Sequence, residues 1–236
     1  MRFAAAFAFD IKLQFRHGFY YAYALISAAY ALLLHLLPEA YRESVDVVLT
    51  FSDPSMLGFF FIGGLVLLEK GQDIHDSLFV TPYKPSEYIF SKTLSLTFLS
   101  LLTSYAVHVS TFGFNTNPLL FLASVALTSM FFTLIGLGVA VRCKTINGFF
   151  FASSVYTIVF VLPVFETVGL WRSPLFTILP AKASLLLLGS AFQPIKVEEI
   201  IYSLCLLLAW CGLAYIWTRH SFRTFIILKI GGARGR

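Results

Sequence analysis

The chain has 236 residues, of which 58% are hydrophobic and only 12% are charged, and its mean hydropathy is +0.82. These values lie outside the range of soluble globular proteins and indicate a membrane protein. The formal net charge of +5 is spread between apolar runs rather than gathered in one patch, which argues against nucleic-acid binding.

Residues 1–18 form the first expected element. Apolar side chains recur every fourth residue from Phe3 to Phe15, and the basic side chains lie on roughly the opposite side. The segment is too short to cross a membrane and contains Asp10, so we predict an amphipathic helix lying on anionic headgroups of membrane lipids. A cleaved signal peptide is the alternative, but Asp10 and Lys12 directly follow its apolar part.

Six uncharged runs predict an all-α, polytopic fold with six transmembrane helices in one domain, residues 1–236. The runs fall near 19–37, 54–68, 93–112, 118–141, 145–165 and 199–218. If the charged segment between the second and third runs is cytoplasmic, both termini are cytoplasmic too. That face then holds 13 of the 17 Lys and Arg residues, as the positive-inside rule requires.

Residues 69–88, between the second and third runs, are charged and cannot remain in hydrocarbon. Their side chains separate at helical spacing into an apolar set, Ile74, Leu78 and Phe79, and a polar set, Asp73, His75 and Asp76. Thr81-Pro82 should end this helix, and Pro85-Ser86 can start the next one. Such a short amphipathic helix at a membrane face suits docking to a soluble partner.

The third run carries a stripe of hydroxyl side chains from Thr93 to Thr111, within an arc of about 80°. The stripe predicts either hydrogen bonds between helices or a lining of the transport path. His108, on the same stripe, is interpreted as a packing residue rather than a proton relay.

The fifth run combines aromatic and hydroxyl side chains. Such a surface suits an amphipathic solute, and the candidate path residues are Phe150, Ser154, Tyr156 and Thr157. The alternative is a helix that faces lipid. Small residues at Gly136, Gly138 and in the Gly148/Ala152 pair predict close helix contacts.

Residues 166–198 are broken by several prolines, and their apolar part is only about half as long as a crossing requires. We predict an outer, re-entrant or interfacial lid that includes Trp171 and Pro180. The alternative is a connector packed on the bundle.

No nucleotide-binding, protease or hydrolase motif is present, and Cys143, Cys205 and Cys211 have no metal-ligand spacing. The acidic residues lie near or outside the ends of the predicted spans. An ion-coupled carrier would bury ionisable groups near the membrane midplane, so we expect no such coupling, no metal and no enzyme activity in this chain.

Parts of the charged segment resemble the signature of type-2 (ABCG-like) permeases of ATP-binding-cassette exporters, especially bacterial drug and antibiotic efflux permeases of the fluoroquinolone type. The similar runs are Leu67-Leu68-Glu69-Lys70-Gly71, Leu78-Phe79-Val80-Thr81-Pro82 and Glu87-Tyr88 followed by Lys92. Gly71 is followed by Gln-Asp where that family more often has a small hydroxyl residue.

This resemblance implies a homodimer in the bacterial cytoplasmic membrane, bound to a separate ATPase subunit that holds ATP and Mg, with no cofactor in this chain. The second and fifth helices would line the path of an amphipathic drug, antibiotic, peptide or lipid-like solute. The ATPase-coupling residues would be Glu69, Gly71, Asp73, Ile74, Asp76, Leu78, Phe79, Thr81 and Pro82.

Two other functions stay open. An intramembrane lipid-modifying enzyme would need a nucleophile–base or metal constellation. A non-transporting scaffold would use the charged segment only to bind a cytosolic protein.

Overall fold

The computed structural model describes residues 2–53, 57–114 and 118–228, and these residues form helices and no strands. The helices in chain order are α1 (Arg2–Arg16), α2 (Phe19–Leu36), α3 (Glu39–Ser52), α4 (Gly58–Gly71), α5 (Ile74–Leu78), α6 (Pro85–Phe112), α7 (Pro118–Ala140), α8 (Ile146–Val161), α9 (Val164–Thr167), the 3₁₀ helix η2 (Pro174–Ile178), α10 (Pro180–Gly189), α11 (Val197–Phe222) and the π-helix η3 (Arg223–Ile227). The predicted all-α class is confirmed.

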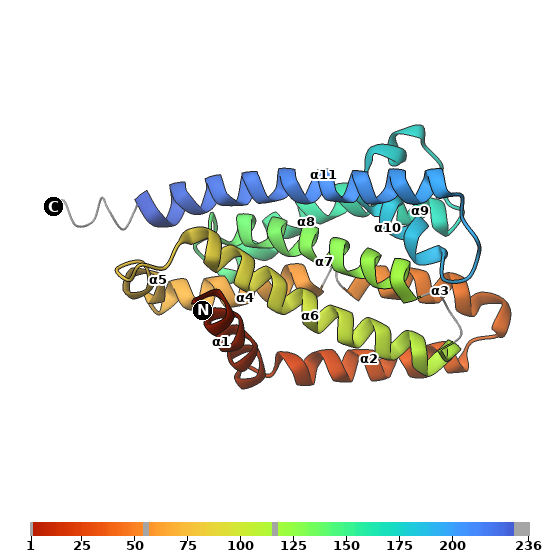
Figure 1. The fold of residues 1–236 in the computed structure, drawn as a ribbon, viewed down its shortest axis with the longest axis horizontal. Coiled ribbons are helices and arrows are strands. Elements are labelled where there is room, and N and C mark those ends of the chain that lie inside the picture. Colours follow the sequence, from red (N-terminus) through yellow and green to blue (C-terminus); the bar gives the residue numbers. More distant parts are fainter. Residues whose placement is uncertain (1, 54–56, 115–117, 229–236) are drawn as a thin grey trace.

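The central helix of the bundle is α7, and α4, α6 and α11 pack around it (Figure 1). Every residue from 131 to 140 is buried. A Cβ atom on Gly136 would lie 2.7 Å from the carbonyl oxygen of Phe59 in α4, and one on Gly138 would lie 2.2 Å from the ring of Trp217 in α11. Gly136 and Gly138 therefore allow close helix approach, as predicted, whereas a Cβ atom on Gly148 would meet within 4 Å only Thr145, which caps the same helix.

Among the described residues, four helices are long and apolar enough to cross a membrane: α2, α6, α7 and the segment Val197–Ile227, which joins α11 to η3. They match the first, third, fourth and sixth predicted spans. The helices at the second and fifth predicted spans are shorter, with 14 residues in α4 and 16 in α8. Residues 54–56, where the second predicted span begins, lie outside the described residues.

The additional helix α3 precedes α4, and the two follow one another along the bundle (Figure 1). This helix was not expected, because residues 39–52 carry four charged side chains, Glu39, Arg42, Glu43 and Asp46. Its buried residues nevertheless fall on one side, at Asp46, Val47, Thr50 and Phe51. Helical spacing therefore turns the side chain of Asp46 inward together with apolar neighbours.

One end of the bundle, here called the α5 end, holds α1, α5, the turn at 141–145 and the C-terminal end of α11 (Figure 1). The opposite end, here called the α10 end, holds the α2–α3 turn and the segment from α9 to α10. The four charged segments that the sequence assigned to one membrane face thus come together at the α5 end, as far as they are described.

Between α8 and α11 the chain is broken into α9, η2 and α10, as the prolines predicted. Pro180 occupies the first turn of α10, a position where proline is well tolerated. This ten-residue helix packs against α3, α7 and α11. Thr128 and Ser184 share a hydrogen bond of 2.6 Å, so α10 is joined to α7 inside the bundle.

Candidate functional site

At the α5 end, a buried lysine lies between two carboxylates from two other helices. Lys92 of α6 places its Nζ atom 2.8 Å from Asp10 Oδ1 of α1 and 2.6 Å from Glu69 Oε1 of α4. All three residues are buried, and the second oxygen of Asp10 accepts a hydrogen bond from Ser91. One cation therefore connects three helices in a place where an unpaired charge would be costly.

Tyr88 and His75 extend this cluster to α5. Tyr88 lies one helical turn before Lys92 and donates a hydrogen bond of 2.5 Å to Glu69 Oε2. Because the single hydroxyl proton is used there, His75 Nε2 must donate to the Tyr88 oxygen, 3.2 Å away. Asp10, Glu69, His75, Tyr88 and Lys92 are hereafter called the α5-end cluster.

Burial decides the protonation state of His75. Removal from water lowers the pKa of this imidazole, and the nearby carboxylate of Glu69 offsets this effect only in part. The neutral ring agrees with the hydrogen bond that it donates through Nε2. At the edge of the cluster, burial and then the charge of Asp10 raise the pKa of Tyr83 to about 12, so its phenol stays protonated at neutral pH.

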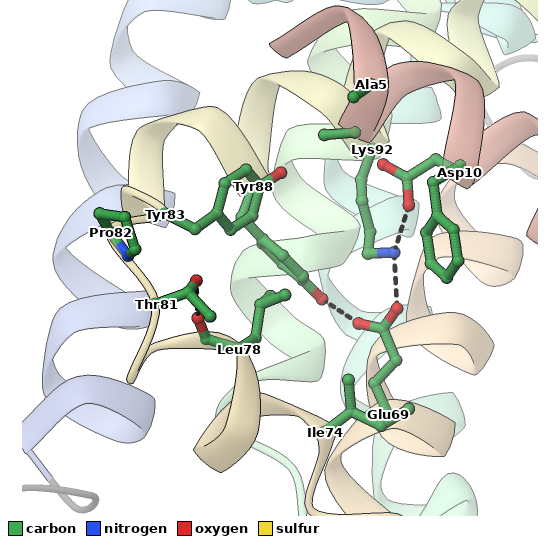
Figure 2. A pocket seen from close by; sticks show the side chains of 12 residues that line it. Ala5, Asp10, Glu69, Ile74, Leu78, Thr81, Pro82, Tyr83, Tyr88 and Lys92 are labelled. Carbon is green, nitrogen blue, oxygen red and sulfur yellow. Dashed lines mark hydrogen bonds and ion pairs between the residues drawn. The ribbon is translucent and has the colours of Figure 1, made fainter. Parts of the chain in front are cut away.

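A pocket of about 540 Å³ opens beside the α5-end cluster, between α1, α5 and the start of α6 (Figure 2). The side chains of Ile74 and Leu78 from α5 lie on one side, next to Glu69, Tyr88 and Lys92. Residues from Ala5 to Asp10 of α1 close the other side. The pocket is large enough for a bulky apolar side chain of a partner, and its floor carries charge.

The predicted coupling residues do not form one surface. Glu69 is buried, and Ile74 and Leu78 are half-buried at the pocket. Phe79 turns instead toward α11, with its ring centre 5.5 Å from that of Phe222. The remaining predicted residues are exposed, namely Gly71, Asp73, Asp76, Thr81 and Pro82.

The short helix itself ends as predicted. Asp73 precedes it with a left-handed φ of 52°, a conformation that aspartate adopts more readily than most residues. The helix ends before Thr81-Pro82, and Pro85 begins α6. The expected position of His75 on the polar side is wrong, because this ring is 3% exposed and packs between Phe79, Tyr88 and Phe222.

Sequence reasoning missed Asp10 and Lys92 as members of the site. Asp10 was interpreted as an interruption of an interfacial helix, yet it and Gln14 form the buried side of α1. Gln14 donates a hydrogen bond of 2.7 Å to Ser95 of α6. The available signals were the i, i+4 spacing of the two polar residues and the isolated lysine at the start of a long uncharged run.

The candidate path residues on α8 point in different directions. Phe150 and Ser154 are exposed, whereas Thr157 is buried. Tyr156 packs on Trp217 of α11, with ring centres 5.7 Å apart. In the predicted lid, Trp171 is exposed and rests on Phe176, and Pro180 is buried at the start of α10.

The hydroxyl stripe on α6 faces protein. Ser100 lies within hydrogen-bond distance of Tyr23 of α2 and Ser129 of α7. His108 makes a 2.9 Å contact with Asp46 of α3, and its ring lies against Phe121. The stripe therefore joins helices, which was one of the two expected roles.

Two acidic residues that the sequence placed near or outside the ends of the predicted spans are buried within the bundle. Asp46 is fully buried, and Asp53, directly after α3, is 3% exposed. Both lie against α6, through His108 in one case and Thr103 and Ser104 in the other. The pattern of uncharged runs could not show this, because both residues precede the run that was interpreted as the second span. Among the described residues, no three His, Cys, Asp or Glu side chains gather as metal ligands would.

Comparison with known proteins identifies relatives over nearly the whole chain. The sequence profile of the fluoroquinolones export permease protein family matches residues 1–230. Fluoroquinolones export permease proteins of Mycobacterium tuberculosis, from strains CDC 1551 / Oshkosh and ATCC 25618 / H37Rv, are each 26% identical over 197 residues. Each alignment covers 83% of this chain and 83% of the relative.

Proposed function

Because this chain belongs to the fluoroquinolones export permease protein family, we propose that it is the membrane-spanning permease subunit of an ATP-driven exporter. ATP and Mg²⁺ would be bound by a separate ATPase subunit, since the chain has no phosphate-binding glycine-rich loop. The exported solute would be an amphipathic drug, antibiotic, peptide or lipid-like molecule. The name of the two mycobacterial relatives favours a drug.

The observation that carries this proposal is the attachment of α5 to the helices on either side of it. Glu69 at the end of α4 binds both Tyr88 and Lys92 of α6, and His75 adds α5 to the same cluster. A force on α5 would therefore move the ends of α4 and α6 together rather than bend a loose loop. Such a rigid connection suits the transmission of a conformational change from a soluble partner.

Lys70 connects α4 to a further part of the α5 end. Its Nζ atom donates hydrogen bonds of 2.9 and 2.8 Å to the carbonyl oxygens of Val141 and Cys143, in the turn that joins α7 to α8. Movement of α5 would thus reach α7 and α8 as well. This connection supports the proposal that ATP-driven closure of the partner changes the packing of the whole bundle.

The pocket beside α5 offers a docking site with a defined chemistry. A partner side chain inserted there would contact Ile74 and Leu78, and the exposed carboxylates of Asp73 and Asp76 would orient it. We therefore expect an apolar side chain flanked by basic residues on the ATPase. The α5 end would face the cytoplasm, in line with the distribution of Lys and Arg.

A second copy of the chain would complete the transport path along α4 and α8. These helices are neighbours, since a Cβ atom on Gly63 would lie 2.0 Å from the ring of Phe149. The outer side of α8 exposes large apolar side chains, including Phe150, Phe151 and Ile158. In a homodimer, these side chains would line the cavity between the two copies rather than face lipid.

The test is the Leu78→Asp variant of the tagged permease. Burial of a leucine side chain is worth about 1.5–3 kcal/mol, so a charge at this position should weaken ATPase binding at least about tenfold. We expect loss of the ATPase on affinity capture, or ATP hydrolysis that no longer drives export in lipid vesicles.

Leu170→Asp is the matched control. Leu170 is 73% exposed in the segment between α9 and η2, so the same substitution there should leave ATPase capture and coupled transport unchanged. Unaltered capture and unaltered coupled export in Leu78→Asp would refute the assignment of α5 as the coupling helix.

A further inference from the structure

Asp53 is a buried carboxyl group whose hydrogen-bond partners among the described residues are two hydroxyl groups. Its Oδ2 atom accepts hydrogen bonds from Thr103 Oγ1 at 3.1 Å and from Ser104 Oγ at 3.2 Å. Within residues 2–53, 57–114 and 118–228, its Oδ1 atom has no hydrogen-bond partner and the carboxyl group has no ion pair. The side chain therefore differs from Asp10 and Glu69, which share Lys92.

A small polar cavity lies beside this carboxyl group. Its volume is about 10 Å³, and its lining includes Asp53 and five hydroxyl residues from α2, α3 and α6: Ser27, Tyr30, Thr50, Thr103 and Ser104. Thr50 lies one turn before Asp53, is 3% exposed and has no hydrogen-bond partner for Oγ1 in the described part of the chain. The cavity can hold at most about one water molecule.

Few ionisable groups surround Asp53, and among the described residues no cation is paired with its carboxyl group. They comprise Tyr23 and Tyr30 from α2, Asp46 from α3 and His108 from α6. The helix α10 also packs on α3, but its Lys182 is ion-paired with Glu166 at 2.9 Å. Asp46 lies seven residues, or about 10 Å, from Asp53 along the chain. Oδ2 of Asp46 contacts Nδ1 of His108 at 2.9 Å, so this nitrogen is not available to Asp53.

An ionised carboxylate in these surroundings would be unfavourable, because no cation among the described residues neutralises its charge in a medium of low polarity. A metal ion would have to lose its hydration shell to enter a space of one water molecule. A proton requires no space and gives Oδ1 a donor that can reach the neighbouring hydroxyl oxygens.

We propose that Asp53 is a proton-binding site inside the membrane domain. The proton comes from water and forms a bond with Oδ1, and the neutral carboxyl group is the form that packs between α2 and α6. When α3 moves away and water reaches the site, the bond breaks, the proton returns to water and the carboxylate remains.

This site gives the transport cycle a dependence on pH. With α3 packed as described, the protein binds one proton more than in a state in which Asp53 is hydrated. Low pH therefore favours the packed state, and high pH favours movement of α3 away from α2 and α6. Since α3 leads into α4 and from there to Glu69, proton release would accompany a movement of the coupling helix. Only this consequence rests on the proposed function, whereas proton binding is a property of the permease alone.

The experiment is infrared spectroscopy of the full-length permease in lipid, with Asp53→Asn and Glu43→Gln as the variants. We expect wild-type protein at neutral pH to show the carbonyl band of a protonated carboxylic acid that is absent in Asp53→Asn. Glu43, an exposed residue of the same helix, should contribute no such band, so Glu43→Gln should match the wild type. A wild-type spectrum identical to that of Asp53→Asn would overturn the proposal.

Thermal unfolding of the same proteins provides a second readout. As the pH rises above about 4, where the unfolded carboxyl group loses its proton, the midpoint of the wild type should fall relative to Asp53→Asn by about 3–5 °C per pH unit, until the folded site also releases its proton. Replacement of Na⁺ by choline at fixed pH should change neither protein. A Na⁺-dependent stabilisation of the wild type that Asp53→Asn lacks would assign the site to sodium and overturn proton binding.

If Asp53→Asn does not fold, Thr103→Val replaces it. This variant removes a hydroxyl that donates to the carboxylate, so the protonated-acid band should persist to higher pH than in the wild type. An unchanged titration of the band would contradict the proposal.

Discussion

At the α5 end, Lys92 contacts the carboxylates of Asp10 and Glu69 at 2.8 and 2.6 Å, whereas farther along the same helix Asp53 receives only two hydroxyl groups. Both sites are buried, and α6 supplies a contact to each of them. The first carries a permanent cation together with its anions, and the second can be neutral only by taking up a proton or an ion. The same helix thus holds one fixed electrostatic connection and one that depends on solution conditions.

This difference separates two mechanical roles. A buried, hydrogen-bonded ion pair holds α1, α4 and α6 in one arrangement, because removal of any partner leaves an uncompensated charge. A protonatable group allows its helix to exist in two arrangements that differ by one proton. The α5 end is therefore suited to transmit movement, and the region around Asp53 is suited to permit it.

The largest expected effect follows from removal of the cation at the α5 end. Lys92→Met leaves Asp10 and Glu69 buried without their shared partner, and breaking such a pair costs about 3–5 kcal/mol. We expect a strongly reduced yield of folded protein and a lower thermal unfolding midpoint in detergent.

The control for Lys92→Met restores neutrality. The triple variant Lys92→Met, Asp10→Asn, Glu69→Gln removes the charge from all three side chains and should recover most of the lost stability. If the triple variant is no more stable than Lys92→Met, shape rather than charge accounts for the effect, and the contrast with Asp53 loses its electrostatic basis.

Much of the fold follows from the pattern of uncharged runs. The runs near 93–112, 118–141 and 199–218 correspond to α6, α7 and α11, because each is long enough to satisfy its own backbone in hydrocarbon. The proline positions likewise predicted the end of α5 and the broken segment before α11. These are local signals, which a single sequence carries directly.

The ionic contacts could not be predicted in the same way. Asp10 and Lys92 are 82 positions apart, and Asp46 and His108 are 62 apart. Each member looks like an exception when only its own helix is considered. Asp46 and Asp53 were placed outside the membrane because charge was treated as a sign of exposure, yet α6 supplies hydroxyl and imidazole partners that make their burial possible.

A smaller effect concerns pH at the α5-end cluster. Burial lowers the pKa of His75, so the folded protein keeps this ring neutral while the unfolded chain binds a proton below a pH of about 6.5. The unfolded state then binds more protons, and stability falls as the pH decreases, by at most about 1.4 kcal/mol per pH unit. Protonation of His75 thus acts in the direction opposite to that of Asp53.

The measurement for His75 is the unfolding midpoint between pH 7 and pH 5 in wild type and His75→Asn. Asparagine does not titrate, so the variant should show a flatter dependence on pH. His17→Asn, which changes an exposed histidine, should keep the wild-type dependence. Equal slopes in wild type and His75→Asn would show that this ring does not resist protonation.

The smallest expected effect sharpens the comparison most directly. Asn has nearly the shape of a protonated Asp, its carbonyl oxygen can accept from Thr103 and Ser104, and its amide can donate into the small cavity. Asp53→Asn should therefore cost no stability: it should change the free energy of unfolding by less than about 1 kcal/mol near pH 4, and it should stabilise the protein at higher pH, where the unfolded wild type releases its proton. Glu69→Gln is the matched substitution at the α5 end, and it should cost about 1–3 kcal/mol because the charged Lys92 and the hydroxyl of Tyr88 both lose their carboxylate. Unfolding of both variants in the same detergent at one pH gives the comparison. A loss of unfolding free energy for Asp53→Asn as large as that for Glu69→Gln would mean that Asp53 is ionised in the folded protein and that both regions depend on fixed charge.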